Sequence, residues 1–144
     1  MFSKACEHGL RAVIYIASQS LEGRRVKIGD IAKYTDSPEA FTGKVIGALA
    51  KYHIVNSHTG PKGGFDLSKQ QMIDTRVGDV IKAIDGDDAY LGCVLGLKEC
   101  SEANPCPMHE QFSKVRFTLK KVLETTTIYD LATNFKLGKS VLKK

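Results

Sequence analysis

Residues 28–67 read IGDIAKYTDSPEAFTGKVIGALAKYHIVNSHTGPKGGFDL, and this stretch decides the fold. Residues 28–34 have the apolar spacing of a short helix. The sequence SPE at 37–39 then offers a hydroxyl N-cap, a proline suited to the first helical position and an acid at the positive end of the helix dipole. A second helix is therefore predicted from Pro38 to about His53. Two helices joined by so short a turn indicate a helix-turn-helix.

A β-hairpin is predicted directly after this pair of helices. Residues 54–58 and 65–67 are short strand candidates, and the sequence TGPKGG at 59–64 between them consists of turn-forming residues. A hairpin that follows a helix-turn-helix is the wing of a winged-helix domain. The combination favours binding to double-stranded DNA.

The flanking sequence is helical apart from one loop. Apolar residues recur at helical spacing in residues 5–18, 75–83, 108–126 and 128–135. The predicted fold class is mainly α with a small β-hairpin wing. We divide the chain into a winged helix-turn-helix DNA-binding domain (1–88), a cysteine-rich, cluster-binding loop (89–107), and a long dimerisation helix with a tail (108–144).

Composition restricts the class of protein. The 144 residues are 42% hydrophobic and 26% charged, which is typical of one globular folding unit, and no stretch is apolar enough to cross a membrane. The net charge of +5 favours a polyanionic partner. With no export signal, the four cysteines are expected to be reduced thiols in the cytoplasm.

Three of these cysteines lie in the predicted loop. Cys93, Cys100 and Cys106 are separated by six and then five residues, and His109 follows three positions after the last of them. Thiolates with one imidazole form a complete ligand set for an iron-sulfur cluster. Zinc is the competing metal, although its structural sites usually pair cysteines two to four residues apart, and bare redox thiols are a further alternative. A catalytic cysteine needs a positioned base, but His8, His53 and His58 lie in the predicted DNA-binding half, so the sequence does not predict an enzyme.

The chain resembles the winged-helix regulators that include the iron-sulfur cluster regulator IscR, the nitric-oxide sensor NsrR and the cysteine-metabolism repressor CymR. The resemblance covers nearly the whole chain. It rests on HGLRAVIYIA near the N-terminus, on the helix-turn-helix, on the glycine-rich wing SHTGPKGGFDL, on RVGDVIKAIDG before the loop, and on the three cysteines.

This resemblance implies a cytoplasmic bacterial homodimer that binds a palindromic operator and carries a [2Fe-2S] or [4Fe-4S] cluster on its three loop cysteines. His109 matches the fourth ligand of IscR-like members, and Glu7 matches the acidic ligand that the partner supplies in NsrR-like members. Two departures from the family pattern leave both fourth ligands and both cluster types as alternatives: the first cysteine spacing is one residue longer than usual, and Cys6 adds a thiol beside Glu7.

We also predict how the helix from Pro38 meets DNA. Its N-terminal part should enter the major groove, where recognition helices carry their base contacts. Thr42 and Lys44 are expected nearest the base edges, and Phe41 is expected to pack or to touch a thymine methyl. Contacts with the backbone and from the wing are assigned to Ser37, Thr59 and Lys62.

The sequence thus predicts an iron-sulfur-dependent transcriptional repressor that senses nitric oxide, redox state or cluster supply. Two alternatives remain. One is a DNA-binding regulator that contains zinc or senses through metal-free thiols. The other belongs to a different class, a protein-interaction module that regulates a metabolic enzyme.

Overall fold

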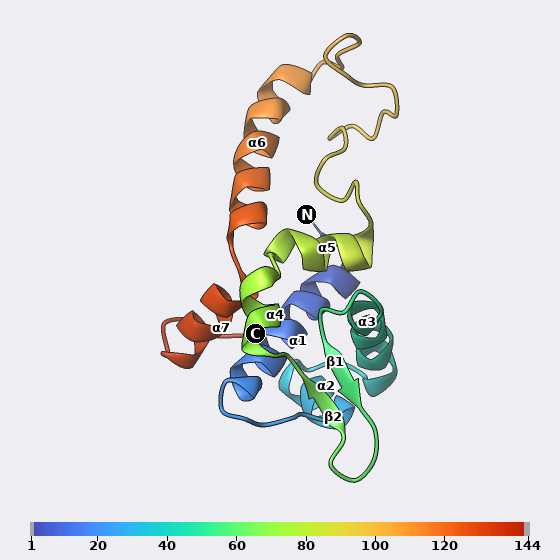
Figure 1. The fold of residues 1–144 in the computed structure, drawn as a ribbon. Helices are drawn as coiled ribbons and strands as arrows, with labels where there is room; N and C mark the ends of the chain where they lie inside the picture. The colour runs from blue at the N-terminus through green and yellow to red at the C-terminus, as the bar shows by residue number, and fades with distance from the viewer. Residues whose placement is uncertain (1, 143–144) are drawn as a thin grey trace.

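The computed structural model describes residues 2–142, and it confirms the predicted fold class of helices with one hairpin (Figure 1). Residues 143 and 144, the end of the predicted tail, lie outside the described part. The elements in chain order are α1 (Lys4–Ser20), α2 (Ile28–Tyr34), α3 (Glu39–Lys51), β1 (Asn56–His58), β2 (Gly64–Asp66), α4 (Lys69–Asp74), α5 (Val77–Asp85), α6 (His109–Thr125) and α7 (Ile128–Lys136).

Helix α1 forms the centre of the main core. It packs against α3, α5 and α7, and its fully buried side chains include Val13 and Ile16. Ile46 of α3 and Ile128 of α7 belong to the same buried cluster. The predicted segment 108–144 is therefore divided in the structure, because α7 joins the core of the winged domain while α6 leaves it.

The helix-turn-helix is present, with one difference at the start of α3. Pro38 occupies the N-cap with extended backbone angles (φ −60°, ψ 143°), and no side chain caps the helix. The predicted cap, Ser37, instead places its hydroxyl 3.1 Å from Nδ1 of His8. Helix α3 therefore begins one residue later than predicted.

The sequence analysis did not predict helix α4. Ser68 caps it by accepting a hydrogen bond from the backbone N–H of Gln71, and Met72 is its buried residue. A six-residue helix with one buried side chain has too few apolar positions for a periodic pattern. Helix α5 follows, and its end at Asp85 precedes Gly86, whose φ of 95° places the backbone in the region that favours glycine.

The wing is an antiparallel pair in which Asn56, Ser57 and His58 oppose Asp66, Phe65 and Gly64. Asp66 lies at the centre of a polar network that holds the wing in place. Its carboxylate is 3.0 Å from Nε2 of His58 and accepts hydrogen bonds from Arg25 (3.1 Å) and Asn56 (3.2 Å). Arg25 also donates to the carbonyl of Lys62 near the wing tip, which ties the wing to the turn after α1.

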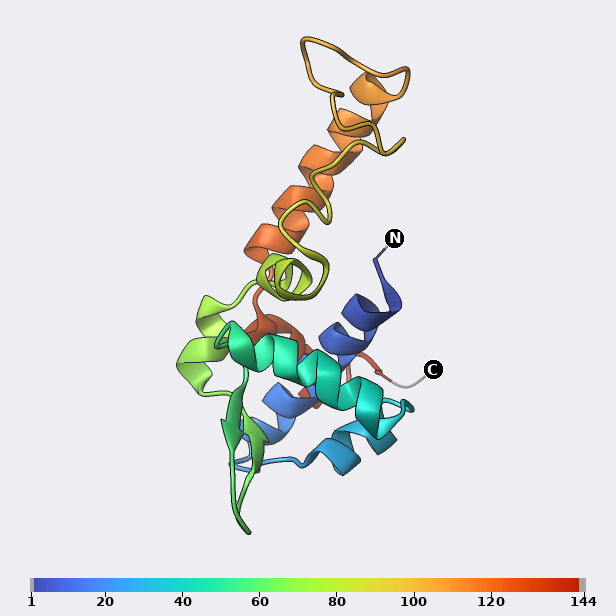
Figure 2. The same cartoon turned by 90° about the vertical axis from the view of Figure 1, so that its right-hand side faces the viewer.

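Helix α6 projects from the core and carries the cysteine loop at its far end, opposite the wing (Figures 1 and 2). Of its 17 residues, Leu123 near the C-terminal end is buried, whereas Val115, Phe117 and Val122 are exposed. Within residues 2–142, no helix combines the length and apolar character needed to cross a bilayer.

Candidate metal centre and DNA-reading face

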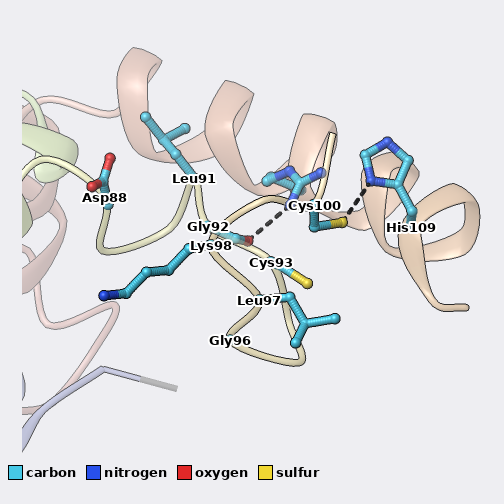
Figure 3. Close-up of a pocket in the computed structure, with 10 residues that line it drawn as sticks. Asp88, Leu91, Gly92, Cys93, Gly96, Leu97, Lys98, Cys100 and His109 are labelled. Carbon is cyan, nitrogen blue, oxygen red and sulfur yellow. Dashed lines mark hydrogen bonds between the residues drawn. The ribbon is translucent and has the colours of Figure 1, made fainter. Parts of the chain in front are cut away.

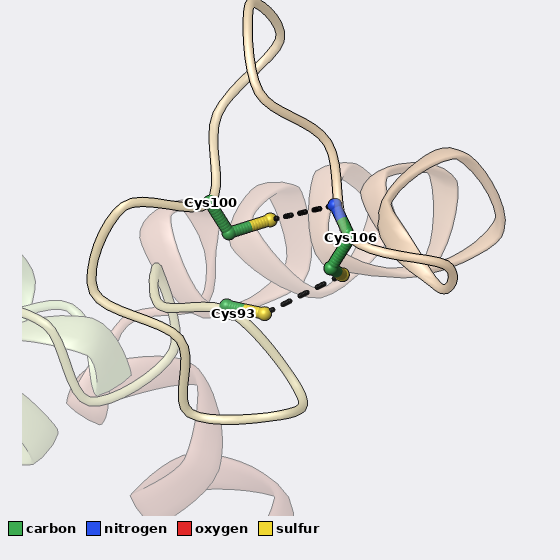
Figure 4. Close-up of side chains that lie close together, drawn as sticks. All are labelled: Cys93, Cys100 and Cys106. Carbon is green, nitrogen blue, oxygen red and sulfur yellow. Dashed lines mark hydrogen bonds between the residues drawn. The ribbon is translucent and has the colours of Figure 1, made fainter.

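The loop between α5 and α6 brings its three thiols together (Figure 4). The Sγ atoms of Cys93, Cys100 and Cys106 all lie within 4.8 Å of one another. The Sγ atoms of Cys93 and Cys106 are 3.6 Å apart, and the backbone N–H of Cys106 donates to Sγ of Cys100 over 3.4 Å. All three side chains are partly exposed, so a metal and its small-molecule reactants can reach them.

His109, the first residue of α6, lies beside this group. Its Nδ1 atom is 3.3 Å from Sγ of Cys100, and both side chains line one cavity (Figure 3). Glu7 does not lie there within this chain. It sits in the first turn of α1, with its carboxylate 3.4 Å from Nζ of Lys4.

Contacts from α6 hold the loop in place. The guanidinium of Arg116 donates to the carbonyl of Gly92 (2.8 Å) and to the hydroxyl of Ser113 (3.3 Å), and Ser113 donates to the carbonyl of His109. Sequence reasoning missed Arg116. Helical spacing places residues 109, 113 and 116 on one face, but it does not indicate the contact of Arg116 with Gly92, which is 24 residues away in sequence.

The start of the loop is anchored separately. Tyr90 is buried, and its hydroxyl donates to Glu124 of α6 over 3.1 Å. Lys82 of α5 pairs with the same carboxylate (3.7 Å) and lies over the Tyr90 ring. The loop is thereby linked to both helices that flank it.

The electrostatics of the loop differ between its thiols. Hydrogen bonds from the backbone of Leu97 and Leu95 lower the pKa of Cys93 to about 7. Burial raises the pKa of Cys106. Cys93 therefore has much thiolate character at neutral pH, and the thiolate is the form that binds metals and reacts as a nucleophile.

The donor set fits a metal centre. Two thiolates on one tetrahedral metal with bonds of about 2.3 Å have sulfurs about 3.8 Å apart, close to the 3.6 Å between Cys93 and Cys106. A cavity of about 590 Å³, lined by Cys93, Cys100 and His109, adjoins the sulfurs and leaves room for inorganic sulfide. The geometry suits an iron-sulfur cluster and also a single zinc ion.

Cys6, the fourth cysteine, lies outside this group. It is fully buried in a second core cluster, and burial together with the nearby Asp85 raises its pKa to about 12. A thiol of this kind stays protonated and acts as a small apolar side chain.

The side chains predicted to read DNA differ in exposure. Lys44 is exposed on α3, and Thr59 and Lys62 are exposed on the wing. Ser37 and Phe41 are partly buried. All five residues remain candidates for contact with DNA.

The prediction for Thr42 is wrong. Its side chain is 0% exposed, its hydroxyl donates to the carbonyl of Pro38 (2.9 Å), and it also lies 3.1 Å from Nε2 of His8. A side chain without exposed surface cannot reach a base edge. The sequence analysis placed Thr42 on the polar side of the helix because its side chain carries a hydroxyl. The residue that this hydroxyl contacts, His8, lies 34 residues away in sequence.

Comparison with known proteins identifies the family. A family model described as an iron-dependent transcriptional regulator, Rrf2, matches residues 2–134. The chain belongs to the Rrf2 family. A relative from Aquifex aeolicus, described as an HTH-type transcriptional regulator, is 34% identical over 133 residues, which cover 91% of this chain and 90% of the relative.

Solved structures of relatives agree with this assignment. CymR, described as the global cysteine regulator of Bacillus subtilis, superposes with a TM-score of 0.75 at 25% identity, covering 92% of this chain and 96% of CymR. IscR of T. potens shows the same fold with a TM-score of 0.72 at 22% identity, covering 98% of this chain and 92% of IscR. This chain is thus a transcriptional regulator of the Rrf2 family with a winged-helix fold.

Proposed function

We propose that this Rrf2-family regulator binds an iron-sulfur cluster on Cys93, Cys100 and Cys106 and that the cluster controls its affinity for DNA. The observation that carries the proposal is the convergence of the three sulfurs within 4.8 Å on a loop between two helices. The description of the family as iron-dependent supports iron over zinc. When bound, such a cluster supplies chemistry that responds to nitric oxide, redox state or cluster supply.

His109 is our first candidate for the fourth ligand, because its Nδ1 atom already lies against Sγ of Cys100. Glu7 from a partner subunit is the second candidate. Its place in the first turn of α1, away from the loop of its own chain, is compatible with a ligand that acts across a dimer. The two assignments can be distinguished by mutation, because the metal centre should be destabilised by a change of His109 in the first case and of Glu7 in the second.

We propose that the protein is a homodimer and that its wing and α3 read a palindromic operator. Lys44 and Phe41 would face base edges in the major groove, while Ser37, Thr59 and Lys62 would contact the backbone. The exposed apolar side chains of α6 support a second copy of the chain as its partner. Repression is the expected outcome at promoters.

The metal proposal is tested on protein purified without oxygen. We expect visible absorption from the cluster, and native mass spectrometry should give the mass of iron and sulfide. Changing any one of the three loop cysteines to alanine should bleach the protein, whereas Cys6→Ala, at the thiol outside the group, should stay coloured. Colourless protein with stoichiometric zinc would establish the zinc alternative.

DNA binding is tested by selection from a randomised duplex library, which should yield a palindrome. Lys62→Ala should weaken binding to all duplexes alike and reduce the slope of log affinity against log salt by about one unit, because a phosphate contact carries no sequence information. A loss restricted to the selected duplex would contradict this role for Lys62.

A metal-free thiol sensor is the second candidate function, and the 3.6 Å between the sulfurs of Cys93 and Cys106 favours it specifically. These two thiols are close enough to form a disulfide after a small shift of the loop. Operator binding that responds to reductant and ignores iron chelation would identify this function.

A further inference from the structure

A buried imidazole connects α1 with the DNA-reading helix α3. His8 is 1% exposed, and both of its ring nitrogens have a partner. Nδ1 is 3.1 Å from the hydroxyl oxygen of Ser37, and Nε2 is 3.1 Å from that of Thr42. The ring also packs on Phe41, with 5.3 Å between the ring centroids. Three side chains that the sequence assigned to DNA are therefore neighbours of one histidine.

The hydrogen atoms of this bridge can be assigned from its partners. The hydroxyl of Thr42 donates to the carbonyl of Pro38, so its oxygen accepts from Nε2–H of His8. Nδ1 then carries no proton and accepts from the hydroxyl of Ser37 over 3.1 Å, a shorter contact than the 3.4 Å from that hydroxyl to the carbonyl of Thr35. Every donor and acceptor is satisfied with a neutral ring, in agreement with burial, which lowers the pKa of His8.

The bridge spans the first turn of α3. Ser37 precedes the N-cap Pro38, and Thr42 lies one turn further along, so the ring holds both ends of the segment that enters the major groove. Helix α3 has no side-chain cap of its own, and the histidine supplies contacts from another helix instead.

The next residue fixes the distance between the helices. A Cβ atom added to Gly9 would lie 3.1 Å from Cγ1 of Val45 in α3 and 2.3 Å from Cδ1 of Ile84 in α5. Helices α1, α3 and α5 therefore meet closely at this level of α1. Helix α5 leads directly into the cysteine loop. Because α1, α3 and α5 are in contact beside His8, a displacement of α5 would move the DNA-reading helix α3.

We propose that His8 is a positioning residue for DNA recognition: it sets the first turn of α3 relative to α1 through simultaneous hydrogen bonds to Ser37 and Thr42. This inference rests on the proposed DNA-binding function. The proposal also gives Thr42 an indirect role in specificity, because its buried side chain helps to position α3 without touching a base.

The experiment compares His8→Phe, which keeps the packing and removes both hydrogen bonds, with His8→Gln, whose amide can restore one of them. Two probes are used: the duplex that the wild-type protein selects from a randomised library, and an unrelated duplex of equal length. We expect His8→Phe to weaken binding to the selected duplex at least about tenfold, since two hydrogen bonds are lost and each corresponds to a factor of up to about ten. Binding to the unrelated duplex should change less than about twofold, because phosphate contacts dominate it. His8→Gln should recover part of the loss.

Thr42→Val removes one end of the bridge with little change in volume, and it also keeps the idea testable if His8→Phe fails to fold. Combined with His8→Phe it should add little further loss of specificity, since both changes break the same contact. Amide hydrogen exchange of the free protein gives a readout without DNA: residues 39–43 should exchange faster in both single variants. Unchanged exchange, together with an unchanged ratio of affinities for the two duplexes, would overturn the role of His8. If the wild-type protein selects no duplex while exchange changes as expected, the proposed DNA function fails instead.

Discussion

At the scale of single residues, several polar side chains of this protein hold neighbouring segments in place through hydrogen bonds. Asp66 illustrates this in the wing. Burial opposes its ionisation, but hydrogen bonds from His58, Arg25 and Asn56 outweigh that effect and lower its pKa below the ordinary value of 3.8. A carboxyl group with a depressed pKa in the folded state stabilises the protein above its unfolded pKa.

The contribution of Asp66 should therefore disappear in acid. It is present above about pH 3.8 and is lost as the pH falls through the lower pKa of the folded state. We expect Asp66→Asn to cost roughly 1–3 kcal/mol of unfolding free energy at pH 7, because bonds to a charged group are lost. Urea unfolding between pH 7 and pH 2.5 should show the difference from wild type shrinking below pH 4. A constant difference would mean that packing, not charge, explains the effect.

Arg116 is expected to position the cysteine loop through its bond to the carbonyl of Gly92. Arg116→Met keeps the apolar stem and removes the guanidinium. In metal-free protein, amides around residues 92–97 should exchange hydrogen faster, and in loaded protein a chelator should remove iron faster. Lys114→Met, an equal loss of charge on an exposed part of α6, is the matched control. Equal behaviour of the two variants would show that charge alone matters.

At the scale of elements, the turn of the wing is sterically constrained. Its turn brings the backbone close to itself at Gly63, where an added Cβ atom would lie 2.4 Å from the carbonyl oxygen of His58 and 2.8 Å from that of Gly60. Backbone atoms cannot move aside as a flexible side chain can. The glycine is thus required by close approach, in contrast to Gly47 on α3, which has no atom within 4 Å of such a Cβ.

We expect Gly63→Ala to open the hairpin turn and to lower stability by about 1–3 kcal/mol, the usual cost of overpacking. Gly47→Ala should do the opposite and raise stability by up to about 1 kcal/mol, because alanine favours the helix. Thermal unfolding of both variants tests the pair. An unperturbed melting temperature in Gly63→Ala would show that the wing can rearrange without cost.

At the scale of the whole molecule, the cysteine loop and the wing lie at opposite ends (Figures 1 and 2). Any effect of the metal centre on DNA binding has to pass through α5, α6 and α1 or through a partner subunit. Helix α6 presents Val115, Phe117 and Val122 to solvent in the single chain. Val115 and Val122 are seven residues apart and share one side of α6, whereas Phe117 lies on the other side of the helix. Exposed apolar surface of this kind is typical of a site of association.

Phe117, 72% exposed, is the side chain that best tests association of two chains through α6. Phe117→Glu should yield monomers in light scattering and native mass spectrometry, since a charge cannot be buried without a partner. Phe117→Leu keeps an apolar side chain and should remain dimeric. The stability of each isolated chain should be unaffected, because the side chain contacts little within its own fold. A dimer that persists in Phe117→Glu would place the interface elsewhere.

The sequence by itself determined the winged helix-turn-helix, the position of the cysteine loop and the long helix after it. Each depends on local patterns: helical periodicity, a proline and an acid at a helix start, turn residues in the wing, and cysteines close in sequence. Only the tertiary structure decided that Thr42 is buried against His8, that α7 joins the core and that Arg116 holds the loop. The partners in the first two cases are far apart along the chain, and contacts of that range depend on how helices pack, which no local pattern records.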